Sequence, residues 1–191
     1  GRQTGKTTSL RWLRDHYNRA GEVLAAWIDL ETAREQPAPA IAFRTILGCL
    51  ERSIARELPA LPLPDAARTE AWLRDPSSAL LRYVRAVCAS APRPLVLFFD
   101  EADCLVGETM VSFLTQLREL YLTRDDAPSP RSVALVGVRS VRDYVLSVDE
   151  RRHVAWLGTA SPFNVTAENV GLAAFTAAEV AELARGRGDS N

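Results

Sequence analysis

The chain has 191 residues, of which 47% are hydrophobic and 25% charged, a composition that suits one globular domain over residues 1–191. Its formal net charge of -1 excludes a global basic field for holding nucleic acid, but leaves a local basic patch open. No apolar run approaches the roughly 20 residues of a membrane span, and Cys49, Cys88 and Cys104, odd in number and without metal-ligand spacing, indicate buried reduced thiols of a cytoplasmic protein.

The chain opens on a polar motif, Gly1-Arg2-Gln3-Thr4-Gly5-Lys6-Thr7-Thr8. This order matches most of a phosphate-binding loop, whose full pattern is a glycine, four residues and then Gly-Lys-Ser/Thr at the turn from a strand into a helix. The first glycine of the pattern would fall one place before Gly1, so the strict pattern is not met. We therefore expect the chain to begin inside the motif, after the strand that leads into it.

The residue types of this motif suit a bound triphosphate. Gly5 lets the backbone curl so that its N–H groups point inward, Lys6 can place an ammonium between the β- and γ-phosphates, and Thr7 can put its hydroxyl on Mg²⁺. Lys6 is the only lysine among the 23 Lys and Arg residues. We expect the other loop residues to line the same nucleotide site: Gly1, Gln3, Thr4 and Thr8. The alternative is a polar turn that resembles the loop by chance.

Hydrophobic periodicity predicts helices and strands that alternate along the chain. A helix over 7–19, ended by Gly21, is followed by a strand over 23–30. Pro37 and Pro39 break the chain before a helix over 41–58. Further helices are predicted at 66–73, 77–89, 108–122, 141–148 and 177–184, and further strands at 95–99, 132–138 and 170–172. This alternation predicts an α/β fold with a parallel sheet covered by helices on both faces.

A second motif follows the apolar strand over 95–99, which ends at Asp100-Glu101. Ligands collect at the carboxyl ends of parallel strands. There Asp100 would bind Mg²⁺ through water, and Glu101 would orient and deprotonate an attacking water. The alternative is a strand that merely ends in an acidic turn. The tetrapeptide Asp100-Glu101-Ala102-Asp103 is also a helicase signature, but the Ser-Ala-Thr motif expected on the next strand is absent.

A third motif, Gly137-Val138-Arg139-Ser140, ends the strand after the acidic one. Many P-loop ATPases place a polar side chain here that senses the γ-phosphate. Ser140 is the candidate, with Arg139 beside it. The alternative is an ordinary turn in which Ser140 caps a helix.

On these residues the chain resembles the AAA+ class of P-loop ATPases, close to the initiator and archaeal-type ATPases. More narrowly it is similar to the bacterial "AAA-like" ATP-binding proteins. The matching stretches are 1–8, 97–103, 136–144 and 161–164. The resemblance implies a three-layer αβα P-loop NTPase fold whose first, central strand is missing from this chain.

The resemblance also assigns roles to residues of the site. It implies nucleotide contact by Lys6, nucleotide and Mg²⁺ contact by Thr7, a metal-ligand role for Asp100, a catalytic-base role for Glu101 and a sensor role for Ser140. Two features depart from the family. Pro162 stands where an arginine that reaches a neighbouring subunit would be, which leaves open Arg139, Arg142, Arg151 and Arg152. The helical lid is absent or reduced to about 176–186.

We therefore expect an AAA+-type core that binds Mg·ATP and hydrolyses it slowly. In one hypothesis, hydrolysis drives work on a partner, and the intact Asp100-Glu101 pair favours it. In the other, the domain is a nucleotide-gated switch or scaffold with little turnover, which the missing arginine finger and the near-zero net charge favour. The expected partner is ATP. A second copy of the chain, a nucleic acid and an effector domain or protein remain open as partners, and we expect no membrane partner.

Overall fold

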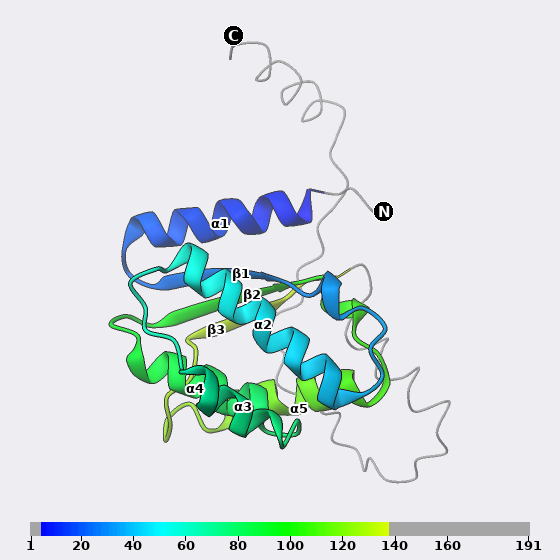
Figure 1. Ribbon diagram of the computed structural model, residues 1–191. Helices are drawn as coiled ribbons and strands as arrows, with labels where there is room; N and C mark the ends of the chain where they lie inside the picture. Colours follow the sequence, from blue (N-terminus) through cyan, green and yellow to red (C-terminus); the bar gives the residue numbers. More distant parts are fainter. Residues whose placement is uncertain (1–4, 138–191) are drawn as a thin grey trace.

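The computed structural model describes residues 5–137, which form one parallel sheet with helices on both sides (Figure 1). The strands pair in the order β1-β2-β3. Along the chain the elements are α1 (Lys6–Ala20), β1 (Leu24–Asp29), the 3-10 turn η1 (Glu31–Ala33), α2 (Pro39–Glu57), α3 (Ala66–Leu73), α4 (Ala79–Ser90), β2 (Leu95–Asp100), the 3-10 turn η2 (Ala102–Cys104), α5 (Gly107–Leu122) and β3 (Ser132–Leu135).

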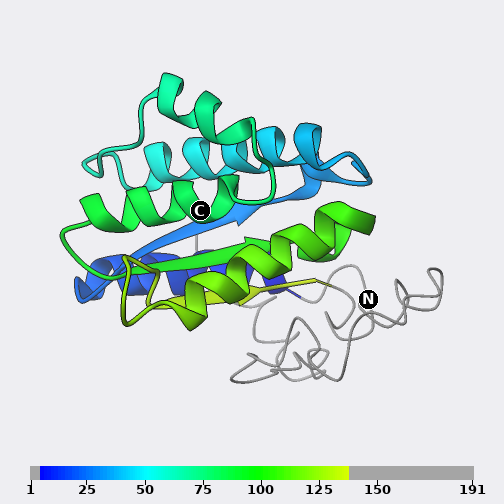
Figure 2. The same ribbon diagram turned by 90° about the horizontal axis from the view of Figure 1, so that it is seen from below.

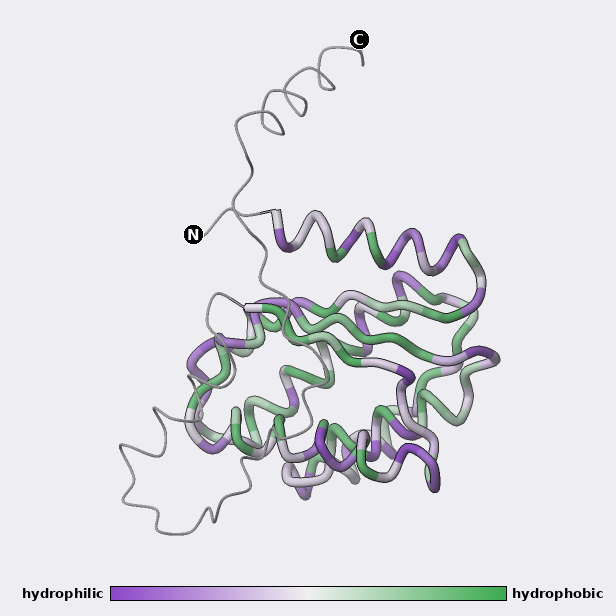
Figure 3. Tube along the Cα trace, turned by 180° about the vertical axis from the view of Figure 1, so that it is seen from behind, coloured by the Kyte–Doolittle hydropathy of each residue, from purple (hydrophilic) through white to green (hydrophobic). Residues whose placement is uncertain are grey.

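The helices divide unequally between the two faces of the sheet. Helix α1 covers one face, and α2, α4 and α5 cover the other, with α3 packed outside α2 and α4 (Figures 1 and 2). The predicted α/β fold with a three-layer αβα arrangement is therefore confirmed for the described residues. Strands β1 and β2 are apolar along most of their length because both of their faces are covered, which the hydropathy colouring makes visible (Figure 3).

Alternate residues of each strand point to opposite faces of the sheet. The odd-numbered residues of β2 belong to the large core shared with α2, α4 and α5. The even-numbered ones, Val96 and Phe98, lie in the small core against α1, together with Trp27 of β1. Asp100 continues this even-numbered series, so its side chain is directed to the α1 side.

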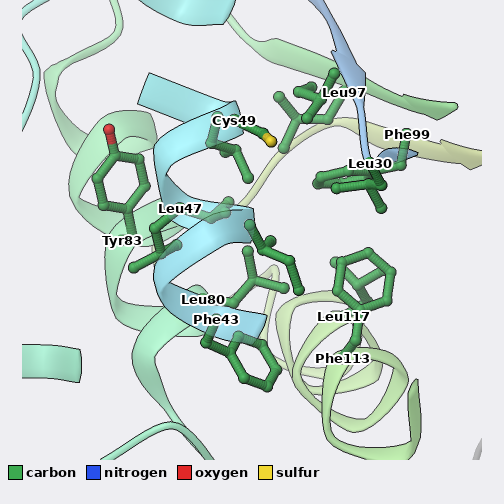
Figure 4. Close-up of a cluster of buried hydrophobic side chains, with 14 of the residues drawn as sticks. Leu30, Phe43, Leu47, Cys49, Leu80, Tyr83, Leu97, Phe99, Phe113 and Leu117 are labelled. Carbon is green, nitrogen blue, oxygen red and sulfur yellow. The ribbon is translucent and has the colours of Figure 1, made fainter. Parts of the chain in front are cut away.

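The large core joins the sheet to three helices through close-packed aromatic and aliphatic side chains (Figure 4). Phe99 of β2 and Phe113 of α5 meet edge to face with their ring centroids 5.3 Å apart. A pair of this kind stabilises the fold by about 0.5–1.5 kcal/mol beyond the area that it buries. In α1, by contrast, only Leu10 is buried.

The outer edge of β1 is closed by side chains rather than by another strand within the described part of the chain. The side-chain amide of Asn18 accepts from the backbone N–H of Ala25 at 2.8 Å and donates to its carbonyl at 2.9 Å. The carboxylate of Glu57 accepts from the backbone N–H of Trp27 at 2.8 Å. The same carboxylate pairs with Arg14 at 2.7 Å, so α1 and α2 are joined across this edge.

The observed boundaries agree closely with the predicted ones, with instructive exceptions. Pro39 begins α2 instead of breaking the chain before it, because proline is well tolerated in the first helical turn, where its missing N–H has no partner to lose. The turns η1 and η2 were not predicted, since three residues are too few to show a period. The elements expected at 141–148, 170–172 and 177–184, and the lid at about 176–186, lie outside the described residues.

Candidate functional site

The N-terminus of α1 meets the carboxyl end of β2. Gly5 adopts a left-handed conformation (φ 73°) as the chain enters α1, which suits a residue without a Cβ. The hydroxyl of Thr7 donates to Oδ2 of Asp100 at 2.6 Å. Asp100 is only 2% exposed, and its Oδ1 accepts from the backbone N–H of Glu101 at 3.1 Å. The first and second sequence motifs therefore form one site.

Lys6 connects the same helix to the end of β3. Its ammonium donates to the backbone carbonyl of Gly137 at 2.9 Å. A Cβ on Gly137 would lie 2.6 Å from Oδ1 of Asp103, which is closer than real Cβ contacts come. The backbone there is further bound by the N–H of Ala102, which donates to the carbonyl of Val136 at 2.9 Å. Gly137 is thus a position where the backbone and an acidic turn come too close for a side chain.

Trp27 reaches the same carboxylate from β1. Its indole N–H donates to Oδ2 of Asp100 at 3.2 Å, and the guanidinium of Arg11 lies 4.3 Å from the centre of its ring. Trp27 is 6% exposed. The sequence analysis did not select it. The available signal was its odd-numbered place in an apolar run ending at Asp29, which puts it on the α1 side once the register with β2 is known.

Glu101 lies at the edge of the site in a left-handed conformation (φ 54°), which is uncommon for residues other than glycine. Its carboxylate is about one third exposed and lies 3.5 Å from the guanidinium of Arg34, which also forms an ion pair with Glu31. Burial raises the pKa of Glu101 above its ordinary value, and the nearby carboxylates of Asp103, Asp100 and Glu31 raise it further, against the opposing effect of Lys6. An acid with a raised pKa among other charged groups is a candidate for proton transfer.

The structure brings together the central residues of the predicted site and leaves others undescribed. Lys6, Thr7, Asp100 and Glu101 converge at the carboxyl ends of the strands, and Thr8 is exposed on the first turn of α1. Gly1, Gln3, Thr4 and Ser140 lie outside the described residues.

The three cysteines take no part in this chemistry. Cys49 and Cys104 are buried, as predicted, whereas Cys88 is only half-buried. The thiol of Cys104 donates to the carbonyl of Leu30 at 3.0 Å. Burial raises the pKa of both Cys88 and Cys104 to about 12, so neither is a thiolate at neutral pH.

Comparison with known proteins identifies the family to which the chain belongs. No helix within residues 5–137 is both long enough and apolar enough to cross a membrane. Neither the curated proteins nor the solved structures contain a match to the chain. The family model described as an AAA domain, however, matches residues 2–145, which is more than half of the chain and includes both halves of the site. The chain therefore belongs to the AAA domain family of P-loop ATPase domains.

Proposed function

We propose that the domain binds Mg·ATP at the junction of α1 with the carboxyl ends of β2 and β3 and hydrolyses it slowly. The observation that carries the proposal is the 2.6 Å hydrogen bond between Thr7 and Asp100, because it unites the phosphate-loop motif with the acidic strand end. Lys6, on the same turn of helix, would supply the ammonium for the phosphates.

The donor set at this junction fits a magnesium ion. Mg²⁺ prefers oxygen ligands and is held by one or two protein groups together with waters and substrate phosphates. Thr7 and Asp100 offer a hydroxyl and a carboxylate side by side. A bound Mg²⁺ would neutralise charge on the phosphates. We assign Thr7 as a ligand, and Asp100 as a ligand that acts through water.

Glu101 is the group that we assign as general base. Its raised pKa brings it closer to the working pH of a proton acceptor, and its position next to Asp100 places it beside the metal site. Hydrolysis would then serve work on an effector domain or protein partner in the cytoplasm. Ser140 would act as the sensor of the γ-phosphate, and Gly1, Gln3 and Thr4 would complete the loop.

A second function, a nucleotide-gated switch or scaffold with little turnover, is favoured by one contact. The guanidinium of Arg34 lies 3.5 Å from the carboxylate of Glu101. In that position it would compete with an attacking water molecule for the carboxylate. An Arg-held carboxylate is a poorer proton acceptor than a free one. In this case ATP would bind without appreciable hydrolysis.

Two substitutions test these functions together. Lys6→Ala should weaken binding of fluorescently labelled Mg·ATP by about tenfold or more, because a hydrogen bond to a charged group is worth about 1.5–3 kcal/mol. Glu101→Gln should leave binding intact and reduce phosphate release by about 10²–10⁴-fold, the usual contribution of a general base. Arg19→Ala is the matched control, since it removes one exposed positive charge from the other end of α1.

The outcomes separate the alternatives. Equal binding by the wild type and Lys6→Ala would refute the site. Binding by the wild type with a slow phosphate release that Glu101→Gln leaves unchanged would favour the switch.

A further inference from the structure

Trp27 lies outside the sequence motifs, yet it contacts three other elements of the fold. Its backbone N–H donates to Glu57 of α2 at 2.8 Å. One face of its ring lies 4.3 Å from the guanidinium of Arg11, a cation–π contact with α1. Its indole N–H donates to Asp100 at 3.2 Å. The residue is 6% exposed, so it is held both by packing and by polar contacts.

The orientation of the Asp100 carboxylate depends on the hydrogen bonds that its two oxygens accept. The last torsion of an aspartate side chain is broad and sets the direction of both oxygens. In Asp100, Oδ1 is held by the backbone N–H of Glu101 at 3.1 Å, and Oδ2 by the hydroxyl of Thr7 at 2.6 Å together with the indole N–H of Trp27. Of the two donors on Oδ2, only the indole is a side chain without a proposed metal-ligand role.

The two donors also differ in what they can still do. A hydroxyl can donate one hydrogen bond and offer its lone pairs to a cation, whereas an indole nitrogen is a donor only. The hydroxyl of Thr7 can therefore donate to Asp100 and bind a cation at the same time, whereas the indole of Trp27 can only donate to Asp100. In the structure the indole N–H and the hydroxyl of Thr7 contact the same oxygen, Oδ2 of Asp100.

We propose that Trp27 is a positioning residue for the metal site, whose indole N–H holds the carboxylate of Asp100 in the orientation that magnesium binding requires. This inference rests on the proposed function, because it concerns the Mg²⁺ of Mg·ATP. Groups that orient metal ligands through hydrogen bonds commonly change metal affinity by about 10–100-fold when they are removed.

The test measures the magnesium requirement of nucleotide binding in the full chain. Trp27→Phe removes the N–H and keeps an aromatic ring under Arg11. With labelled ATP and increasing MgCl₂, Trp27→Phe should need about tenfold or more magnesium for half-maximal binding. Its binding of labelled ATP in EDTA should match the wild type. Trp12→Phe is the matched control, because Trp12 is 58% exposed on α1, and it should leave both quantities unchanged.

A second measurement is made on the wild type, and Trp27→Phe serves only to identify the indole signal. In the wild type labelled with ¹⁵N-tryptophan, the indole N–H signal that is lost in Trp27→Phe should exchange with solvent more slowly than that of Trp12. It should also shift when MgCl₂ is added to the ATP-bound chain. Asp100→Ala should remove the slow exchange.

The possible results are distinct. Equal magnesium requirements in Trp27→Phe and the wild type, an equal loss of binding in EDTA and in MgCl₂, or an indole N–H that exchanges as fast as that of Trp12 would each overturn the inference and leave the proposed function standing. Failure of the wild type to bind ATP at all would overturn the proposed function and, with it, this inference.

Discussion

At the scale of single residues, the site brings the backbone of Gly137 close to Asp103 and gathers several carboxylates around Glu101. Gly137 has no Cβ where one would meet Asp103, and Glu101 takes a left-handed backbone conformation beside Asp100. The carboxylates of Asp100, Asp103 and Glu31 all raise the pKa of Glu101. Such an arrangement costs stability and is typical of functional sites, where strain and like charge serve binding or catalysis.

The raised pKa of Glu101 predicts a pH-dependent effect of its substitution. The folded chain holds this proton more tightly than the unfolded chain does, so ionisation of Glu101 costs stability. The contribution of Glu101 to the free energy of unfolding falls as the pH rises from the ordinary glutamate pKa through the higher pKa of the folded chain. Glu101→Gln, which stays neutral, should therefore melt at a higher temperature than the wild type at pH 7. The difference should shrink as the pH is lowered below about 4.

Thermal melts without nucleotide, at constant ionic strength between about pH 4 and 8, measure this difference. Glu70→Gln is a control of opposite sign, because the hydrogen bond from Arg44 lowers the pKa of Glu70. A lower melting temperature for Glu101→Gln than for the wild type at pH 7 would contradict the prediction.

At the scale of elements, side chains of two helices pair with backbone groups along the outer edge of β1 in the described part of the chain. Unpaired edges invite pairing with other chains, and proteins commonly protect them. Here Asn18 of α1 reproduces the pairing of a neighbouring strand for Ala25, and Glu57 of α2 does so for one N–H of Trp27. The two helices thereby hold β1 in the register that directs Trp27 toward Asp100.

Asn18→Ala should destabilise the chain by about 1–3 kcal/mol, because it leaves a buried N–H and a buried carbonyl of Ala25 without a partner. Urea denaturation should show a lower midpoint with an unchanged slope. His16→Ala, at an exposed position of the same helix, should change the midpoint little. If Asn18→Ala lowers the urea midpoint no more than His16→Ala does, water or another group replaces the amide of Asn18.

At the scale of the whole molecule, the two faces of the sheet are unequally supported. A large core joins the strands to α2, α4 and α5, whereas α1 contributes a single buried residue to its own side. The helix that carries Lys6 and Thr7 is thus the least buried of the helices packed directly on the sheet in the described chain. Its attachment includes polar contacts at both ends, of Lys6 with Gly137 and Thr7 with Asp100 at the first turn, and of Asn18 with Ala25 near the last.

Ligand binding should therefore stabilise the whole chain measurably. At a concentration of Mg·ATP about 100 times its Kd, linkage predicts about 2.7 kcal/mol of added stability. For a domain of this size that is a rise of roughly 5–10 °C in Tm. Differential scanning fluorimetry should show the rise in the wild type and in Arg19→Ala, and lose most of it in Lys6→Ala or when EDTA replaces magnesium. An equal rise in Lys6→Ala would place ATP elsewhere on the chain.

The sequence by itself determined the elements and the candidate chemistry. Apolar runs and helical spacing predicted the described helices and strands to within about two residues at most boundaries, because these patterns reflect which faces are buried locally. The Lys6-Thr7 and Asp100-Glu101 pairs were selected for the same kind of reason, since each is a short stretch of chemistry at the end of a predicted element. Those four residues are the ones that the fold brings together.

Only the tertiary structure decided which groups act on one another. Trp27 and Arg34 belong to no motif, and their contacts with Asp100 and Glu101 cross 73 and 67 positions of sequence. Such pairs depend on strand order, on the register that aligns Asp29 with Asp100, and on the face to which each side chain turns. A shift of one residue in that register would turn Trp27 away from the carboxylate, because successive strand residues face opposite sides of a sheet.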